Sequence, residues 1–207
     1  MAAKLDKLVL ASSNPGKLRE IESVLSPMGI EILPQTGLGI QDAEEPFRTF
    51  LENALTKARH AARQSRLPAL ADDSGICANA LGGEPGVHSA RYAAVAGDPL
   101  PRDEQDRRNN LKLVTELRGH EDRRAHYYCV IVMVRHADDP QPLIAEGSWN
   151  GRIILEPRGE NGFGYDPYFL LPDLNLTAAE IDPAQKNLVS HRGKALRRLM
   201  ARLKEES

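Results

Sequence analysis

Two adjacent carboxylates, Asp72 and Asp73, stand directly after the apolar segment 68–71 and directly before Ser74 and Gly75. The segment 68–71 is predicted to be a short strand, which puts the acidic pair at a strand end that leads into a turn. Carboxylates in such a position can hold Mg²⁺ and orient a water molecule for attack. The alternative interpretation is a plain turn, which Asp, Ser and Gly all favour.

A second acidic pair, Glu44 and Glu45, precedes Pro46. It offers further oxygen ligands for a cation. Taken alone, the pair is better explained as the first turn of a helix opening at 44–46, where acidic side chains complement the helix dipole. Farther along this predicted helix, Asn53 and Lys57 are expected to form a solvated polar face.

A predicted strand-to-helix turn carries small polar residues and one cation. Asn14 suits the N-cap position and Pro15 suits the first helical position. Free backbone N–H groups at a helix start bind anions, and the dipole disfavours a cation such as Lys17 there, so the pattern favours an anionic ligand. A solvated lysine on an ordinary helix is the alternative. The candidate phosphate-binding residues are Ser12, Ser13, Asn14, Pro15, Gly16 and Lys17.

A second basic helix start occurs at 190–194, with Lys186 just upstream. Arg192 offers a planar fork of donors and His191 a ring donor, so together they suit carbonyl or phosphate oxygens. A solvated basic turn explains the same residues if no ligand is present.

The glycine-rich segment 159–166 is predicted to be a loop around one aromatic ring. Its glycines permit close backbone approach, and Phe163 could stack on a flat ring. Asp166 could accept a hydrogen bond from a ring N–H of that ligand. The alternative is a hairpin loop whose phenylalanine caps the core. Gly164 and Tyr165 complete the candidate base-binding residues of this loop.

These features together indicate a ligand with phosphates, a planar base and a bound metal ion, which describes a nucleoside triphosphate. We expect the strand ends and helix starts to converge, so that Asp73 faces the same centre as Lys17 and Arg192.

The remaining pattern predicts an α/β fold in one domain. Apolar segments at 8–11, 31–33, 68–71, 126–136 and 143–150 predict strands, the last two as an antiparallel hairpin, and a short strand is expected at 168–171. Helices are predicted after Asn14, from Pro46, over about 104–118, from Thr177 and from His191. The first, second and last of these helices carry apolar residues at helical spacing. Strands alternating with helices along the first third of the chain indicate an α/β sheet.

The composition excludes several classes of function. With 207 residues, a formal charge of −2 and acid and base interspersed, the chain shows no general field for nucleic acid or membrane. Cys77 and Cys129 lack zinc-site spacing and are expected to be small buried residues in a reducing compartment. No apolar run approaches membrane-spanning length, so a cytoplasmic protein is expected.

At these residues the sequence resembles the Ham1/RdgB family, the inosine/xanthosine triphosphate pyrophosphatases of non-canonical purine nucleotides. The matching segments span almost the whole chain in the family's order, and Ser12 stands where many members have Thr. The segments are Leu10–Lys17, Thr49–Ala54 with Lys57 and Ala58, Ala71–Gly75, Leu81–Gly86 with Ser89–Tyr92, Gly162–Pro167 and Ser190–Gly193.

The resemblance implies a Mg²⁺-dependent hydrolase in a homodimer. Its expected reaction converts dITP, ITP and XTP to the monophosphate and pyrophosphate, which removes deaminated purines from the nucleotide pool. Its expected fold is a long mixed sheet flanked by helices, a single domain over 1–207 with two lobes around a central cleft.

The resemblance also implies roles for single residues. Asp73 resembles the proton acceptor and a metal ligand, with Glu44 and possibly Glu45 as a second metal contact. The segment 12–17, with Ser74 nearby, is expected to bind the phosphates. The residues expected to bind the purine nucleoside are Phe163, Gly164, Tyr165, Asp166, Lys186, His191 and Arg192.

Two other functions fit parts of this pattern. One is a nucleotide pyrophosphatase of broader specificity, and the other is a non-catalytic regulator that binds nucleotides. A regulator should keep the phosphate and base contacts but lose the acidic pair, which is intact here.

Overall fold

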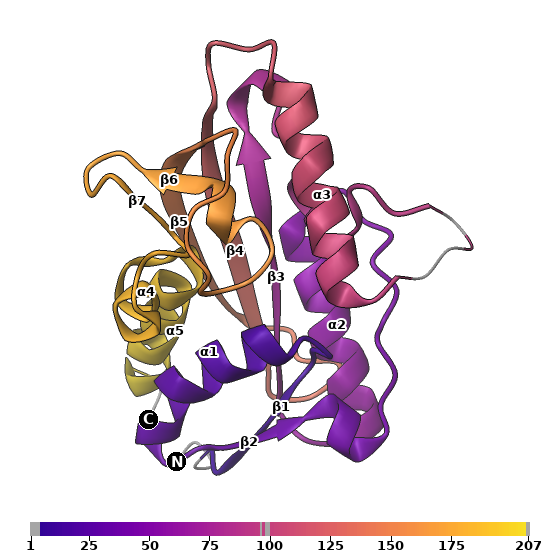
Figure 1. The fold of residues 1–207 in the computed structure, drawn as a ribbon. Coiled ribbons are helices and arrows are strands. Elements are labelled where there is room, and N and C mark those ends of the chain that lie inside the picture. Colours follow the sequence, from indigo (N-terminus) through magenta and orange to yellow (C-terminus); the bar gives the residue numbers. More distant parts are fainter. Residues whose placement is uncertain (1–4, 96, 98–99, 206–207) are drawn as a thin grey trace. The chain divides into compact units, whose positions relative to one another are not determined.

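The computed structural model describes residues 5–95, 97 and 100–205. Its seven strands form one sheet in the order β2-β1-β3-β4-β5-β6-β7 (Figure 1). Strand β1 pairs in parallel with β2 and β3, whereas β6 pairs antiparallel with β5 and β7, so the predicted mixed sheet is confirmed. The strands are β1 Lys7–Leu10, β2 Glu31–Pro34, β3 Ala69–Ala78, β4 Arg124–Val134, β5 Leu143–Ile153, β6 Phe169–Leu171 and β7 Leu176–Thr177.

Five α-helices accompany these strands in the described part of the chain. They are α1 Pro15–Leu25, α2 Phe50–Ser65, α3 Arg102–Leu117, α4 Pro183–Val189 and α5 His191–Glu205. Over the described residues, none of the helices has the length and apolar character needed to cross a bilayer.

The chain divides into two compact units, each with its own apolar core. The first unit comprises Met1–Asp73, Cys129–Gly147 and His191–Ser207, and the second comprises Ser74–Tyr128 and Ser148–Ser190. Strands β3, β4 and β5 contribute residues to both. The prediction of a single domain with a cleft between two lobes stays a prediction.

The core of the first unit is aliphatic. Helices α1 and α5 pack against each other there (Figure 1), burying Ile21 and Leu25 from α1 and Leu196 and Leu199 from α5. Their spacing places each pair on one helix face, which is the pattern that predicted both helices.

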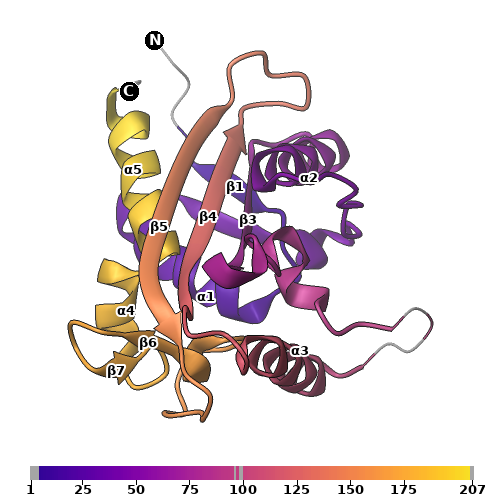
Figure 2. The same ribbon diagram turned by 90° about the horizontal axis from the view of Figure 1, so that it is seen from above.

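The core of the second unit is built around aromatic rings. Phe169 is fully buried, with its ring centroid 4.7 Å from that of Tyr127 and 5.5 Å from that of Trp149. Helix α3 adds Leu113 and Leu117 to this core. Figure 2 shows β4 and β5 running side by side to the turn at 135–142, which confirms the predicted hairpin.

Three local predictions were wrong. Strand β3 does not end before the acidic pair but continues to Ala78, so Asp72 and Asp73 lie inside a ten-residue strand. Helix α2 begins at Phe50 rather than at 44–46. The sequence Thr177–Glu180 forms the end of β7 and a turn, and the next helix, α4, starts after the N-cap Asp182.

The late start of α2 has a local cause. Thr49 is its N-cap, with Oγ1 accepting from the backbone N–H of Glu52, while the Glu52 carboxylate bonds the Thr49 hydroxyl. A threonine followed three residues later by a glutamate is a capping pair. Glu44 and Glu45 therefore precede the helix in a segment that belongs to no helix or strand, and they do not lie in its first turn.

Candidate active site

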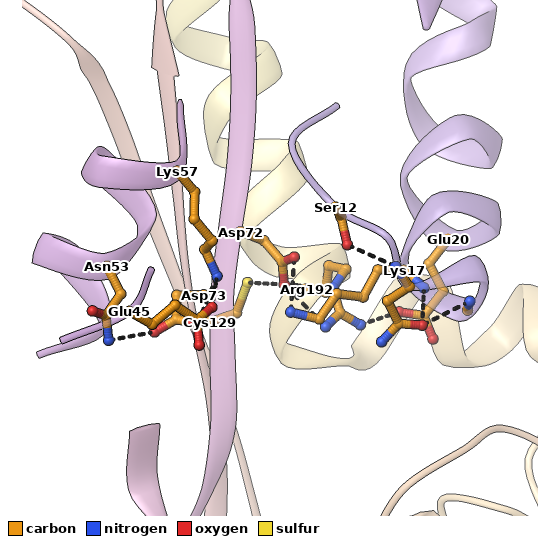
Figure 3. A network of polar contacts seen from close by, with 12 residues as sticks. Ser12, Lys17, Glu20, Glu45, Asn53, Lys57, Asp72, Asp73, Cys129 and Arg192 are labelled. Atoms are coloured by element: carbon orange, nitrogen blue, oxygen red, sulfur yellow. Dashed lines mark hydrogen bonds and ion pairs between the residues drawn. The ribbon is translucent and has the colours of Figure 1, made fainter. Parts of the chain in front are cut away.

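Strand β3 is the element on which the candidate site is built. Successive side chains of a strand point to opposite faces of the sheet, so Asp72 and Asp73 diverge. Figure 3 shows the result: Asp72 points to one side of β3, toward Lys17 and Arg192, and Asp73 points to the other, toward Lys57 and Glu45. All of these residues belong to the first unit. Lys17 and Arg192 contact Asp72 rather than Asp73, and the expectation that Asp73 faces the same centre as these two cations stays a prediction.

The Asp72 side is a buried network of ion pairs. The Asp72 carboxylate, whose side chain is fully buried, lies 3.0 Å from Lys17 Nζ and 3.1 Å from Arg192 Nη2. Arg192 also donates from Nε to Asp72 at 3.2 Å and from Nη1 to Glu20 of helix α1. Two cations thus face two carboxylates, and the charges in this group balance.

The two cations fix the ionisation of Asp72. Burial by itself would raise the pKa of Asp72, but Lys17 and Arg192 outweigh burial and hold this pKa well below its usual range. Removing charges from water is costly unless they are paired and hydrogen-bonded, as they are here. Cys129, whose thiol lies 3.9 Å from the same carboxylate, has its pKa raised by burial and by that negative charge.

Parallel pairing of the strands explains why Lys17 reaches Asp72. Leu10, the last residue of β1, is in register with Leu70 of β3, so the chain that follows β1 emerges beside Asp72. Helix α1 then begins as predicted, with Pro15 in its first turn and Asn14 as N-cap. The Asn14 Oδ1 accepts from the N–H groups of Gly16 at 2.9 Å and Lys17 at 3.3 Å.

This cap changes the prediction for the helix start. Two of the N–H groups that were expected to be free for an anion are already bonded to Asn14. Ser12 Oγ accepts from the Asn14 N–H at 3.2 Å, and the exposed Ser13 hydroxyl donates to Asp42 at 2.8 Å. Binding of phosphate by this segment stays a prediction.

Arg192 and His191 open helix α5, which packs tightly on β5. A Cβ added to Gly147 of β5 would lie 2.1 Å from the His191 carbonyl oxygen, so only glycine allows this approach. Both side chains are buried. The predicted contact of Arg192 with a base stays a prediction, since its guanidinium is engaged by carboxylates here.

The Asp73 side differs in charge. Lys57 Nζ lies 2.9 Å from an Asp73 oxygen and 2.7 Å from a Glu45 oxygen, so one ammonium holds two carboxylates. The group carries a formal excess of one negative charge. Glu45 is half-buried at this centre, whereas Glu44 is exposed to solvent.

Burial and charge act in opposite directions on this pair. Burial raises the pKa of Asp73, and the ammonium groups of Lys57 and Lys17 cancel only part of that rise. Burial would lower the pKa of Lys57, but Asp73 and Glu45 reverse the effect and raise it above its usual value. Asp73 is therefore a carboxylate whose proton affinity is above normal, as suits a general base.

Asn53 and Lys57 do not form the solvated polar face that the sequence predicted, because Asn53 is buried and the Lys57 side chain is only 12% exposed. Asn53 is fully buried; its amide bonds both the N–H and the carbonyl of Phe47 at 3.1 Å and reaches Asp73 at 3.4 Å. It thereby holds the segment that carries Glu45 against α2. Both residues directly precede the buried Ala54 and Ala58, which was a signal that they lie on the inner face.

The chemistry of the Asp73 group fits a magnesium ion. Mg²⁺ binds through one or two carboxylates and completes its shell with waters and substrate phosphates rather than with an all-protein cage. Asp73 and Glu45 supply such a carboxylate pair, held by a single cation. The described residues contain no cluster of three or more His, Cys, Asp or Glu suited to a metal.

The candidate base-binding residues lie in the second unit, as a separate group. Asp166 is buried and accepts from Lys186 Nζ at 2.6 Å, from the Phe163 N–H at 2.9 Å and from the Tyr127 hydroxyl at 3.2 Å. Lys186 also lies 5.1 Å from the centroid of the Phe163 ring. Tyr165 is buried, and its hydroxyl donates to the Ser89 carbonyl at 2.8 Å.

The structure thus brings the predicted residues together as three groups. Phe163, Asp166 and Lys186 form one, Lys17, Asp72 and Arg192 a second, and Asp73 with Glu45 a third. Ser74 is half-buried on β3 next to Asp73. Glu20, Asn53, Lys57, Cys129 and Tyr127 contact these groups but were not among the site residues that the sequence predicted.

A protein with this fold and these groups has the build of a nucleotide-hydrolysing α/β enzyme. The Ham1 family model matches residues 8–202, so the chain belongs to the Ham1 family. It is similar to a dITP/XTP pyrophosphatase of Ralstonia nicotianae, 63% identical over 96% of each chain. A dITP/XTP pyrophosphatase of Burkholderia pseudomallei is 59% identical, covering 98% of this chain and 96% of its own length.

Solved structures agree with this assignment. A HAM1 protein from Coxiella burnetii has a TM-score of 0.86 at 47% identity and covers 96% of this chain and 98% of its own. The Ham1 protein of Staphylococcus aureus has a TM-score of 0.82 at 37% identity, covering 97% of this chain and 100% of its own.

Proposed function

We propose that this chain hydrolyses dITP, ITP and XTP to the nucleoside monophosphate and pyrophosphate, and so removes deaminated purines from the nucleotide pool. The observation that carries the proposal is the Asp73, Lys57 and Glu45 group, in which the ammonium of Lys57 on α2 is shared by Asp73 of β3 and by Glu45. Family membership and relatives named dITP/XTP pyrophosphatases support the same substrate class.

Asp73 and Glu45 are the residues that would hold Mg²⁺. When bound, the metal offsets the negative charge of the phosphates. Glu44, which is exposed, is the weaker candidate of the acidic pair.

Asp73 accepts the proton of the attacking water in this proposal. The neighbouring ammonium of Lys57 favours the ionised form of this carboxylate, which is the form that can accept a proton. Lys57 and Asn53 orient it, the first at 2.9 Å and the second at 3.4 Å. No covalent intermediate is needed, and the thiol of Cys129 is fully buried.

The triphosphate is assigned to the segment Ser12–Lys17 with Ser74. Lys17 is the cation of this segment, and Asp72 holds its ammonium at 3.0 Å. A fixed cation favours the pyrophosphate leaving group because it stabilises charge that develops in the transition state.

The base is assigned to Phe163, Gly164, Tyr165, Asp166 and Lys186, with His191 and Arg192. A 6-oxopurine offers an acceptor at O6, where adenine offers a donor. Facing a donor with a donor leaves a buried polar group unpaired, which costs about 1–3 kcal/mol. ATP should therefore be rejected by roughly tenfold or more for each mismatched group.

One assay separates this function from its competitors. Pyrophosphate release is measured with ITP, XTP, dITP, GTP and ATP, with Mg²⁺ and with a chelator. We expect release from the first three nucleotides only, and only with Mg²⁺. Rates of release from GTP and ATP as high as those from ITP, XTP and dITP would instead indicate a pyrophosphatase of broad specificity. Binding of the nucleotides without hydrolysis would indicate a regulator.

We further propose a homodimer in the cytoplasm. The family resemblance supports the dimer, and light scattering on the purified chain tests it. A monomer at micromolar concentration would contradict it.

A further inference from the structure

Helix α3 holds the glycine at the centre of the candidate base loop from both sides. The Gly164 N–H donates to Asp106 Oδ2 at 3.1 Å, and the Gly164 carbonyl accepts from Asn110 Nδ2 at 2.8 Å. Asp106 and Asn110 are one turn apart, so they present their side chains on the same face of the helix. Asn110 also donates to the Asp106 carbonyl at 2.9 Å, which fixes the orientation of its amide.

The loop needs such support because its backbone is unusual. Gly162 and Gly164, on either side of Phe163, have φ values of +78° and +62°, a region that side chains disfavour. A Cβ on Gly162 would lie 2.0 Å from the Asp166 carboxylate, so the loop wraps closely around that group. Residues 159–164 belong to no helix or strand, and a free loop would lose conformational entropy when a ligand ordered it.

The same face of α3 also reaches the aromatic ring. Arg102, one turn before Asp106, lies with its guanidinium 5.9 Å from the centroid of Phe163, and Lys186 approaches that ring at 5.1 Å. Asp106 is half-buried, and burial raises its pKa while Arg102 and the Gly164 N–H counteract the rise.

We propose that Asp106 and Asn110 are positioning residues for purine recognition. Their hydrogen bonds to the N–H and the carbonyl of Gly164 hold Phe163 and Asp166 in place before the nucleotide binds. The proposal rests on the proposed function, in which this loop receives the base. Neither residue belongs to the groups assigned to the phosphates and the metal. Loss of their hydrogen bonds to Gly164 therefore weakens recognition of the base and leaves the chemical step unchanged.

The test uses a pair of matched variants on one helix. Asp106→Ala removes the acceptor for Gly164, and Asp103→Ala removes the same charge from an exposed position in the first turn of α3. Asp106→Asn keeps an oxygen acceptor and serves as the conservative rescue. The readouts are kcat and KM for ITP, the inhibition constant of ATP as a competitor of ITP, and amide hydrogen exchange of residues 162–166 without nucleotide.

For Asp106→Ala we expect faster exchange at Gly164 and a KM for ITP raised about 10- to 100-fold, the range for a lost hydrogen bond to a charged group. We expect kcat for ITP and the inhibition constant of ATP to change little, so that the preference for ITP over ATP decreases. The KM for ITP and the exchange rate at Gly164 should be close to the parent's values in Asp106→Asn, and they should equal the parent's values in Asp103→Ala.

The outcomes distinguish this proposal from the proposed function. If the parent enzyme does not release pyrophosphate from ITP, the proposed function fails, and base recognition by this loop fails with it. If the parent is active but Asp106→Ala exchanges faster with an unchanged KM, the positioning role is refuted while the function stands. A loss of kcat and thermal stability with unchanged KM would show a purely structural role.

Discussion

Replacing Asp72 by asparagine is expected to destabilise the protein severely. The Asp72 side chain is fully buried, and it is paired with Lys17 and Arg192, whose side chains are 15% and 3% exposed. Removing one partner from a buried ion pair leaves an uncompensated charge and costs about 3–5 kcal/mol. At about 2–4 °C per kcal/mol for a chain of this size, the melting temperature should fall by roughly 6–20 °C.

The pH dependence of the stability shows whether the loss in Asp72→Asn comes from the charge of the Asp72 carboxylate. The pKa of Asp72 is lower in the folded protein than its unfolded value of about 3.9, so its stabilisation is fully present above that value. As the pH falls below about 4, Asp72 becomes protonated in the unfolded chain but stays ionised in the folded protein. Its stabilisation is therefore progressively lost. The difference between parent and Asp72→Asn should therefore be constant from pH 5 to 7 and smaller by about 1 kcal/mol at pH 3.

Urea unfolding followed by circular dichroism measures these free energies. Asp138→Asn is the matched control, since the Asp138 side chain is 90% exposed and faces Arg63 at 3.6 Å. It should change stability by less than about 0.5 kcal/mol. A penalty below about 1 kcal/mol for Asp72→Asn, or one that does not shrink in acid, would refute the assignment of Asp72 as the buried counter-ion.

Two further substitutions test how the site is held. Thr49→Ala removes the N-cap of α2 and should cost about 0.5–2 kcal/mol of unfolding free energy, whereas Thr49→Ser should be near neutral; equal losses would contradict the cap. Gly75→Ala would place a Cβ 2.3 Å from the Gly86 carbonyl oxygen, so we expect a loss of about 1–3 kcal/mol from overpacking, measured by urea unfolding against Gly37→Ala, where the added Cβ has open space. An unchanged midpoint for Gly75→Ala would contradict the close approach at β3.

The fold class was predictable because it depends on local patterns. Apolar runs and the helical stripe of α5 identified most elements, and the pair Asn14 and Pro15 fixed the start of α1. The capping pair Thr49 and Glu52 was equally visible in the sequence, and it would have corrected the start of α2.

The division of the site was not predictable, because it depends on contacts between distant segments. Asp72 and Asp73 remain in a strand since cations neutralise them, and Arg192 comes from 120 positions away. Asp, Ser and Gly favour a turn locally, so only the folded chain reveals the longer strand. Alternation along that strand then separates Asp72 from Asp73, which a turn would not have done.

The contacts of Lys57 could not be predicted from the sequence for the same reason. It lies 12 residues from Glu45 and 16 from Asp73, and a polar residue on a helix is normally solvated. Its role follows from the burial of its neighbours, Ala54 and Ala58, and from the acidic partners that the fold brings to it.

The variant Asp73→Asn tests whether Asp73 accepts the proton of the attacking water. Pyrophosphate release from ITP and calorimetric binding of ITP are measured for this variant, with Asp138→Asn as control. We predict a fall in kcat of about 10²- to 10⁴-fold, the usual contribution of a general base, with binding largely preserved. Near-normal turnover in Asp73→Asn would contradict the account.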